Sequence, residues 1–362
     1  MECVRLWLQL ACVIAALTAG LAPVDPVTIE RVFSAGVYPP IQRLLTSMTN
    51  MAPFAFFDLL ILAAIVATVL VTVRGIRRAR RAGSLRPLAR AAGALVTAGA
   101  VAYLVFLAFW GFNYRRVPMV ERLLLERDAP ATDAVVALGL DAISHVNARY
   151  ADAHRIGWSV LPWQNEPLRS AFAGVQQRLS DAPLAVPGRL KWSIFGPYFR
   201  WTSVDGMVNP FALEVLGNPD LLPLERPMVV AHEWAHLAGY ANESDANFVG
   251  WLTCVRADVP SQYSGWLYLY WQIAGELGRD DRTRLWEAVA EGPRRDIDAI
   301  VQRIQRGQLP MLRTASWRVY DQYLRANRVE EGIRSYDEVI TLILRARFED
   351  GWTPVRRSGP SR

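Results

Sequence analysis

Cysteine is scarce in this sequence of 362 residues: Cys3, Cys12 and Cys254 are the only three. The first two lie in or beside the first apolar run, so the chain after residue 114 holds only Cys254. A disulfide bond within that part is therefore excluded, and so is a Cys-x-x-Cys metal site.

Lysine is almost absent as well, since Lys191 stands against 39 arginines, which is typical of an arginine-favouring codon bias. The formal net charge of +6 comes entirely from residues 1–114, which hold 10 arginines and 4 acids. Residues 115–362 hold 30 basic and 30 acidic residues and are neutral. A neutral domain lacks the basic surface that binds phosphate backbones, so no nucleic-acid partner is expected.

Three long apolar runs crowd the first 114 residues. Leu6–Val24 and Ala91–Tyr114 contain no charged residue, and Phe54–Val73 contains one, Asp58. Because a helix needs about 20 apolar residues to cross the hydrocarbon core of a bilayer, we predict a three-helix transmembrane anchor in contact with the lipid bilayer. The first run has an alternative interpretation as a cleaved signal peptide, since an arginine precedes it and small residues end it.

Basic residues beside these runs predict the orientation of the anchor. Residues 74–90 carry seven arginines, whereas the segment between the first two runs carries only Arg31 and Arg43. Because basic loops stay in the cytoplasm, residues 74–90 are predicted to form an Arg-rich cytoplasmic loop. The chain is then a multi-pass protein of the bacterial inner (cytoplasmic) membrane, with everything after Tyr114 extracytoplasmic. Residues 109–118, FWGFNYRRVP, are typical of an interfacial belt.

The remainder of the chain is predicted to be mainly helical with a small sheet. Helices are expected over 133–151, with Thr132 as the N-cap, and over 166–179. Residues 190–216 are rich in aromatic and β-branched residues and broken by Gly and Pro, which predicts two or three short strands with a turn near Val204–Met207. The predicted organisation is an anchor over 1–114, an α+β domain over 115–350 that is helical again to about 349, and a disordered tail over 351–362.

One stretch carries recognisable chemistry: residues 226–248, RPMVVAHEWAHLAGYANESDANF, contain His232, Glu233 and His236. Residues at i and i+4 share a helix face, so both histidines can bind one metal ion, which we expect to be Zn²⁺. Glu233 would face the zinc-activated water and act as its general base. Gly239 suits the C-terminal end of the helix. An ordinary amphipathic helix that carries two histidines is the alternative.

A catalytic zinc needs a third protein ligand and one open position. No histidine follows His236, but Glu243 and Asp245 come just after a predicted turn, at the start of a second predicted helix over about 243–256. The first turn of that helix would face the histidines, so Glu243 is the predicted third ligand and Asp245 the runner-up. Either acid could instead serve only to favour the N-terminus of its helix.

The sequence identifies the residues that would orient the histidines or stabilise an oxyanion less specifically than it identifies the ligands. Asp245 or Asn247 could hold the imidazole rings in one tautomer. The more distant His145 and His154 are interpreted as exposed helix residues and not as ligands. A donor for a developing oxyanion is also required, and four residues near the motif could supply it or could simply pack: Tyr240, Arg256, Tyr263 and Tyr268.

The run HEWAHLAGYANESDANF resembles the zincin peptidases, and its ESDAN part is similar to the Glu-x-x-Ala-Asn helix of the compact Glu-zincins. The resemblance implies a zincin-like domain with His232, His236 and Glu243 as zinc ligands and Glu233 as the catalytic base. With FWGFNYRR, DGMVNPFALEV and VYDQYLRANRVEEGIRSYDEVI, it covers most of the chain and is similar to a bacterial family of uncharacterised membrane proteins, catalogued as a domain of unknown function. NPFALEV departs from the Pro-Phe-Thr type segment of such relatives, which puts a side-chain contact at Ala212 in doubt.

In zincins an edge strand before the site helix binds extended substrate through its backbone. Residues 208–215, with Asn209 and Phe211, are the candidate strand, and a plain core strand is the alternative. The predicted function is a membrane-anchored zinc metallopeptidase that cleaves a peptide or protein substrate. An intramembrane protease is disfavoured because polar segments flank the histidine pair. A non-enzymatic, zinc-stabilised protein of membrane or envelope assembly or sensing is the second hypothesis.

Overall fold

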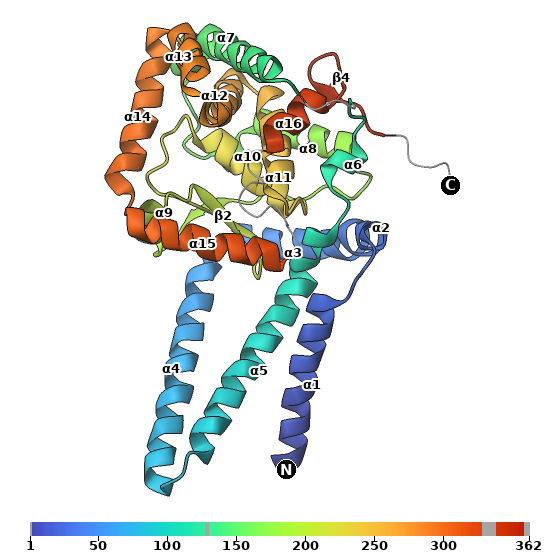
Figure 1. The fold of residues 1–362 in the computed structure, drawn as a ribbon, viewed down its shortest axis with the longest axis vertical. Coiled ribbons are helices and arrows are strands. Elements are labelled where there is room, and N and C mark those ends of the chain that lie inside the picture. The colour runs from blue at the N-terminus through green and yellow to red at the C-terminus, as the bar shows by residue number, and fades with distance from the viewer. Residues whose placement is uncertain (1, 127–129, 328–337, 358–362) are drawn as a thin grey trace.

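Three long helices leave one end of a larger helical body in the computed structural model (Figure 1). The structure describes residues 2–126, 130–327 and 338–357. The mainly helical fold with small sheets is confirmed. The helix predicted to continue through 328–337 and the last five residues of the predicted tail lie outside the described residues. The three long helices are α1 (Glu2–Leu21), α4 (Phe56–Ala82) and α5 (Arg86–Phe109).

Helices α4 and α5 are each long and apolar enough to cross a membrane. Almost none of their apolar stretch is buried inside the protein, which is what lipid contact requires. A third span is present if Leu6–Leu21 and Pro26–Asn50, which meet at 106°, count as one bent span. The structure therefore bears out two apolar helices of membrane-spanning length, while the third span stays a prediction.

The segment 74–90, predicted as a loop, is helical at both ends. Helix α4 runs on through most of its arginines to Ala82, and α5 begins at Arg86. Gly83 ends α4 in the left-handed conformation, with φ of 59°, which glycine adopts at no steric cost. Because arginine is a good helix former, the arginines extend the two helices and only a short turn joins them.

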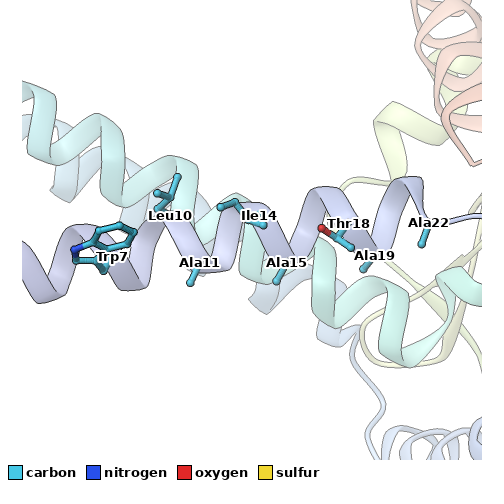
Figure 2. Close-up of a pocket in the computed structure, with 8 residues that line it drawn as sticks. All are labelled: Trp7, Leu10, Ala11, Ile14, Ala15, Thr18, Ala19 and Ala22. Carbon is cyan, nitrogen blue, oxygen red and sulfur yellow. The ribbon is translucent and has the colours of Figure 1, made fainter.

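One face of α1 forms a shallow apolar groove, with its side chains aligned along the helix in Figure 2. Trp7, Leu10 and Ile14 on this face are each at least half exposed. An apolar stripe of this kind suits a helix in contact with hydrocarbon. The remaining residues of the groove are small: Ala11, Ala15, Thr18, Ala19 and Ala22.

The stretch predicted as an interfacial belt is built into the protein. Trp110 is buried, and Arg115 donates to the carbonyl oxygens of Ala19 and Gly20 at the end of α1. Arg116 pairs with Glu30 at 2.7 Å. These groups therefore join the long helices to the body and are buried at the junction. The elements around this junction are α2 (Pro26–Thr28), η1 (Ile29–Val37), α3 (Tyr38–Asn50) and η2 (Gly111–Arg115).

The body is built around three central helices, α10 (Arg226–Leu237), α11 (Glu243–Val255) and α12 (Val259–Glu276). Several of their large aromatic side chains, including Trp234 and Trp251, are fully buried in one continuous core. Around them lie α6 (Met119–Arg122), α7 (Thr132–Ile156), η3 (Pro162–Gln164), α8 (Glu166–Leu179), α9 (Gly196–Thr202), α13 (Arg279–Ala288), α14 (Glu291–Gly307), α15 (Pro310–Ala326) and α16 (Glu338–Arg345).

The predicted helices and strands differ from the observed ones mainly at their ends. Helix α8 has the predicted bounds, whereas α7 begins one residue early and is preceded by Ala131, so Thr132 is not its N-cap. The predicted turn near Val204–Met207 is wrong, because β2 already starts at Gly206 and the hairpin turn lies at 210–213. A short helix, α9, occupies part of the region predicted as strand.

The main sheet has three strands in the order β1-β3-β2: β1 (Leu190–Trp192), β2 (Gly206–Asn209) and β3 (Glu214–Gly217). Strand β3 is central, parallel to β1 and antiparallel to β2, so β2 is an edge strand. The predicted disordered tail is ordered over 351–357, because β5 (Thr353–Pro354) pairs with β4 (Phe348–Glu349). Trp352 also packs against two buried tryptophans there.

A buried carboxylate ties this sheet to the outer end of α4. Glu214 on β3 accepts hydrogen bonds from the backbone N–H groups of Phe56 and Phe57, at 3.0 and 2.7 Å. The ammonium group of Lys191 lies 2.9 Å from the same carboxylate, and both side chains are fully buried. Negative charge is favoured at a helix N-terminus, so Glu214 fixes the direction in which α4 leaves the body.

Candidate metal centre

Helices α10 and α11 are joined by a tight turn that lets them pack face to face. Gly239 ends α10 with φ of 83°, and the Asn242 side chain caps α11 by accepting from the N–H of Ser244. A side chain on Gly250 would lie 3.0 Å from the backbone of His232, so a glycine allows this close approach. The turn therefore brings the start of α11 back to the histidines.

This packing places His232, His236 and Glu243 together. The Nε2 atoms of His232 and His236 lie 3.3 and 3.5 Å from Oε2 of Glu243. Ligand atoms at the corners of a tetrahedral zinc site are about 3.4 Å apart, given zinc–ligand distances of about 2.1 Å. Among the described residues, these three form the group of histidine, cysteine and acidic side chains that could hold a metal ion. The donor set of two imidazoles and a carboxylate fits zinc.

The second nitrogen of His236 is fixed by the backbone. Its Nδ1 lies 2.7 Å from the carbonyl oxygen of Tyr240, which can only accept, so Nδ1 donates its proton there and Nε2 is the nitrogen that faces Glu243. The end of α10 is held by groups from the membrane-proximal segments. Tyr38 donates to the carbonyl of Leu237, and Trp110 donates to that of His236 at 3.2 Å.

The buried charges of the cluster stabilise one another. Burial alone would lower the pKa of His236, but Glu243 outweighs it and raises that pKa to about 9. Burial would likewise raise the pKa of Glu243, but the two histidines hold it well below its usual range. Oε2 of Glu243 is buried without a hydrogen-bond partner among the described residues. A cation between the three side chains would satisfy this oxygen.

Glu233 lies beside the cluster and is as buried as its neighbours. Its Oε2 atom has no hydrogen-bond partner in the described part of the chain, and burial raises its pKa to about 7. The carboxylate lies against Gly206 at the start of β2, where any Cβ atom would overlap it. A buried carboxylate with one oxygen free of hydrogen bonds and a raised pKa is suited to exchange a proton with a reacting group.

Tyr320 on α15 completes the surroundings of Glu243, and sequence reasoning missed it. Its hydroxyl donates to Oε1 of Glu243, which leaves Oε2 facing the histidines. Tyr320 is separated from Glu243 by 77 residues, so no local spacing links them. The available signal was its place in VYDQYLRANRVEEGIRSYDEVI, one of the segments that support the family resemblance.

Asp245 and Asn247 are buried on α11 but have other surroundings. Oδ2 of Asp245 accepts from the backbone N–H of Met119 at 3.2 Å, which ties α11 to the start of α6. Asp245, the runner-up for the third ligand, is absent from the group of side chains that could hold a metal ion. The Nδ2 atom of Asn247 has no hydrogen-bond partner among the described residues. The group that bonds the His236 ring is instead the backbone carbonyl of Tyr240, not Asp245 or Asn247.

The four residues predicted as oxyanion donors are engaged elsewhere or not brought to the cluster. The ring of Tyr240 lies under Arg116. Arg256 donates to Gly351 and Thr353. Tyr263 donates to Asp296. Tyr268 lies on α12 and packs against the core.

The two upstream histidines are partnered and not simply exposed. His145 stacks on Trp266 with ring centroids 4.1 Å apart. His154 lies 2.8 Å from Asp296. Both lie on α7, where His154 is exposed as predicted and His145 is partly buried, and neither belongs to the metal-binding group.

The strand next to the cluster is β2, which begins earlier than predicted. Asn209 ends this strand; its side chain is buried, donates to Glu214 at 3.0 Å and accepts from the N–H of Phe211. Phe211 and the buried Ala212 lie in the hairpin turn. Asn209 therefore supports the turn and Glu214, and the prediction of Phe211 as a strand residue is wrong. The part of β2 that lies against Glu233 is its first residue, Gly206.

Comparison with known proteins gives one family. Searches of curated proteins and of solved structures found no match. A family model described as "Protein of unknown function (DUF3810)" matches residues 33–344, which include α4, α5 and the whole of the candidate metal centre. Since this match spans most of the sequence, the chain belongs to the DUF3810 family.

Proposed function

We propose that this protein is a membrane-anchored, zinc-dependent metallopeptidase. The observation that carries the proposal is the group of His232, His236 and Glu243 with ligand atoms within 4.8 Å of one another, beside the buried carboxylate of Glu233. This combination goes beyond what packing of α10 against α11 requires. An internal ion pair would explain the histidines and Glu243, but not a second, unpartnered carboxylate next to them.

Each group near the cluster has a role in peptide hydrolysis. Zinc, when bound, supplies Lewis acidity that polarises the scissile carbonyl. Glu233 takes a proton from the attacking water and returns it to the leaving amine. The free edge of β2 offers backbone N–H and C=O groups along which an extended peptide can lie, with its scissile bond near Glu233.

The proposed place of work is the outer face of the bacterial inner membrane. The arginines at the turn between α4 and α5 assign that end to the cytoplasm. The body lies at the opposite end of the long helices and would then be extracytoplasmic (Figure 1). His232 and His236 lie in the body, outside α4 and α5, which supports cleavage next to the membrane and not within it.

Metal content tests the site. Purified wild type should contain about one zinc per chain, whereas His236→Ala and Glu243→Ala should lose most of it, because each removes one of three ligands. Asp245→Asn is a matched control on the same helix, since Asp245 does not face the cluster. Full metal content in Glu243→Ala would refute the third ligand.

Peptide turnover tests the reaction. The detergent-solubilised protein should cleave members of a peptide library, and a chelator should stop it. Glu233→Gln should retain zinc but lose about 100-fold or more in turnover, because general-base catalysis contributes that much. If wild type binds zinc and cleaves nothing, the zinc-stabilised assembly or sensing protein becomes the better description. Cleavage by Glu233→Gln at the wild-type rate would remove Glu233 as the base.

A further inference from the structure

Exposed apolar side chains gather at the end of the body from which the long helices leave. They come from the end of β1 and the residues after it, from α9 and from α15; α9 and α15 lie at the lower end of the body in Figure 1. Met311 is 87% exposed and Val319 is 67% exposed. We call this set the basal surface; it consists of Trp192, Ile194, Trp201, Met311, Leu312 and Val319.

Helix α15 carries polar contacts and exposed apolar side chains side by side. Ser316 bonds Tyr198 at 2.7 Å, and Tyr320 donates to Glu243. Leu312 and Val319, whose spacing of seven places them on the same side of the helix, flank these contacts and are 43% and 67% exposed. Large apolar side chains that gather on an exposed surface indicate contact with an apolar environment.

The basal surface is continuous with the outer ends of both spanning helices. At one end, Asp58 in the first turn of α4 accepts from the N–H of Ile194 at 3.0 Å. At the other end, the ring of Tyr323 on α15 lies 6.2 Å from that of Phe106 on α5. Between them, the backbone N–H of Leu309 donates to the carbonyl of Trp201 and joins α15 to α9. A bilayer crossed by α4 and α5 would meet this surface.

We propose that the basal surface rests in the boundary between headgroups and acyl chains of the leaflet at the outer ends of α4 and α5. Tryptophan is favoured at that depth because one end of its ring system is apolar and the other can bond to water or headgroups. Arg313 and Arg318 are exposed on α15 and carry the charge that lipid phosphates attract. An amphipathic helix in this position lies in the plane of the membrane.

The same contact would bring the metal centre close to lipid. Helix α15 links the basal surface to Glu243 through Tyr320. Trp110, which follows α5 directly, has its ring 6.1 Å from that of His236. If the protein is the peptidase proposed above, its substrates are polypeptide segments that lie at the membrane surface, such as those flanking a membrane span. The lipid contact itself does not depend on catalysis.

Fluorescence quenching in lipid tests the contact on the full-length chain. A Cys3→Ser, Cys12→Ser background leaves only Cys254, which is fully buried. Single cysteines at Val319, Val160 and Leu62 are then labelled with a small fluorophore, and the protein is reconstituted in phosphatidylcholine nanodiscs with nitroxide groups near the top of the acyl chains. Val160, which follows α7, is a matched control because it is also an exposed valine, at 80%. Leu62 on α4 is the control for membrane crossing.

The label on Val319→Cys should be quenched by the nitroxide lipid several-fold more than that on Val160→Cys, and iodide in the water should show the reverse order. Equal quenching at Val319 and Val160, with strong quenching at Leu62, would overturn the basal contact and leave the anchor intact. Weak quenching at Leu62 as well would overturn the basal contact and the membrane crossing of α4. Peptide turnover is not measured, so failure of the proposed peptidase activity would show separately.

Discussion

At the scale of single residues, the oxygens without partners carry the most information. The Oε2 atoms of Glu233 and Glu243 are both buried, and neither has a hydrogen-bond partner among the described residues. Leaving a buried acceptor unsatisfied costs about 1–3 kcal/mol, so a fold that leaves two of them requires a reason. A cation bound at Glu243 would explain one of these oxygens, and a proton exchanged by Glu233 would explain the other.

Tyr320→Phe tests how Glu243 is oriented. The variant keeps the ring but removes the hydroxyl that bonds Oε1, so Oε2 is no longer directed at the histidines. Loss of a group that orients a metal ligand lowers metal affinity about 10- to 100-fold. Competition with a zinc indicator measures this. Tyr198→Phe is the matched control. It removes the tyrosine hydroxyl that bonds Ser316 of α15, away from Glu243, and should leave zinc affinity unchanged. An unchanged affinity in Tyr320→Phe would show that its bond is incidental.

Sequence spacing reaches only part of this site. His232 and His236 lie one helical turn apart on α10, and Glu243 begins the next helix after a short turn. The proximity of these three residues can therefore be predicted from the sequence. Tyr320 and Gly206 are brought in by tertiary packing, which no local pattern encodes. Phe211 lies in the hairpin turn and not in the strand, and the buried bond of Asn209 to Glu214 likewise depends on how the hairpin folds.

At the scale of elements, the contact between β2 and α10 depends on a missing side chain. Gly206→Ala would place a Cβ atom against the Glu233 carboxylate, with Cγ and Cδ both at 3.0 Å, and would move it. Displacement of a catalytic group by about 1 Å costs about 100-fold in rate, so turnover should fall by that order while zinc content stays. Gly174→Ala in α8 is the matched control because nothing lies near its added Cβ. Full activity in Gly206→Ala would separate β2 from the reaction.

The anchoring of α4 to the sheet is a second contact between elements. Glu214→Gln removes the charge that the Lys191 ammonium and the first N–H groups of α4 share. Breaking a buried ion pair from one side costs about 3–5 kcal/mol, because it leaves the other charge unpaired. Denaturant unfolding in detergent should show this loss, and Lys191→Met in the same chain should restore part of it. Glu291→Gln in an exposed pair should leave the midpoint unchanged. A Glu214→Gln midpoint equal to wild type would contradict the anchoring role.

The periodicity of apolar residues in the sequence identifies the long helices well, but it predicts the segments that connect them poorly. Helix α8 has its predicted bounds because its apolar pattern is regular and Asn165 caps it. The Arg-rich segment 74–90 and the tail after 350 are polar, and polarity was taken to mean loop or disorder. Their order comes from a left-handed glycine at Gly83 and from tertiary packing of Trp352, which hydropathy does not report.

At the scale of the whole molecule, the metal centre joins parts that are otherwise far apart in the chain. Trp110 and Tyr38 hold the end of α10, Tyr320 brings in α15, and Glu243 begins α11. The candidate spans therefore meet the body at the same helix ends that present the ligands. A change at the candidate metal centre should therefore alter the stability of the whole body.

Removal of zinc should then lower the unfolding temperature of the wild-type protein. A ligand that binds only the folded state at 100 times its dissociation constant stabilises it by about 2.7 kcal/mol, and for a domain of this size each kcal/mol corresponds to about 2–4 °C. Chelation should therefore shift the midpoint in detergent by about 5–10 °C, and added zinc should reverse the shift. Glu243→Ala, which lacks a ligand, should respond to neither treatment. An equal shift in both proteins would trace the effect to the chelator, because Glu243→Ala lacks a ligand and should bind little zinc to lose.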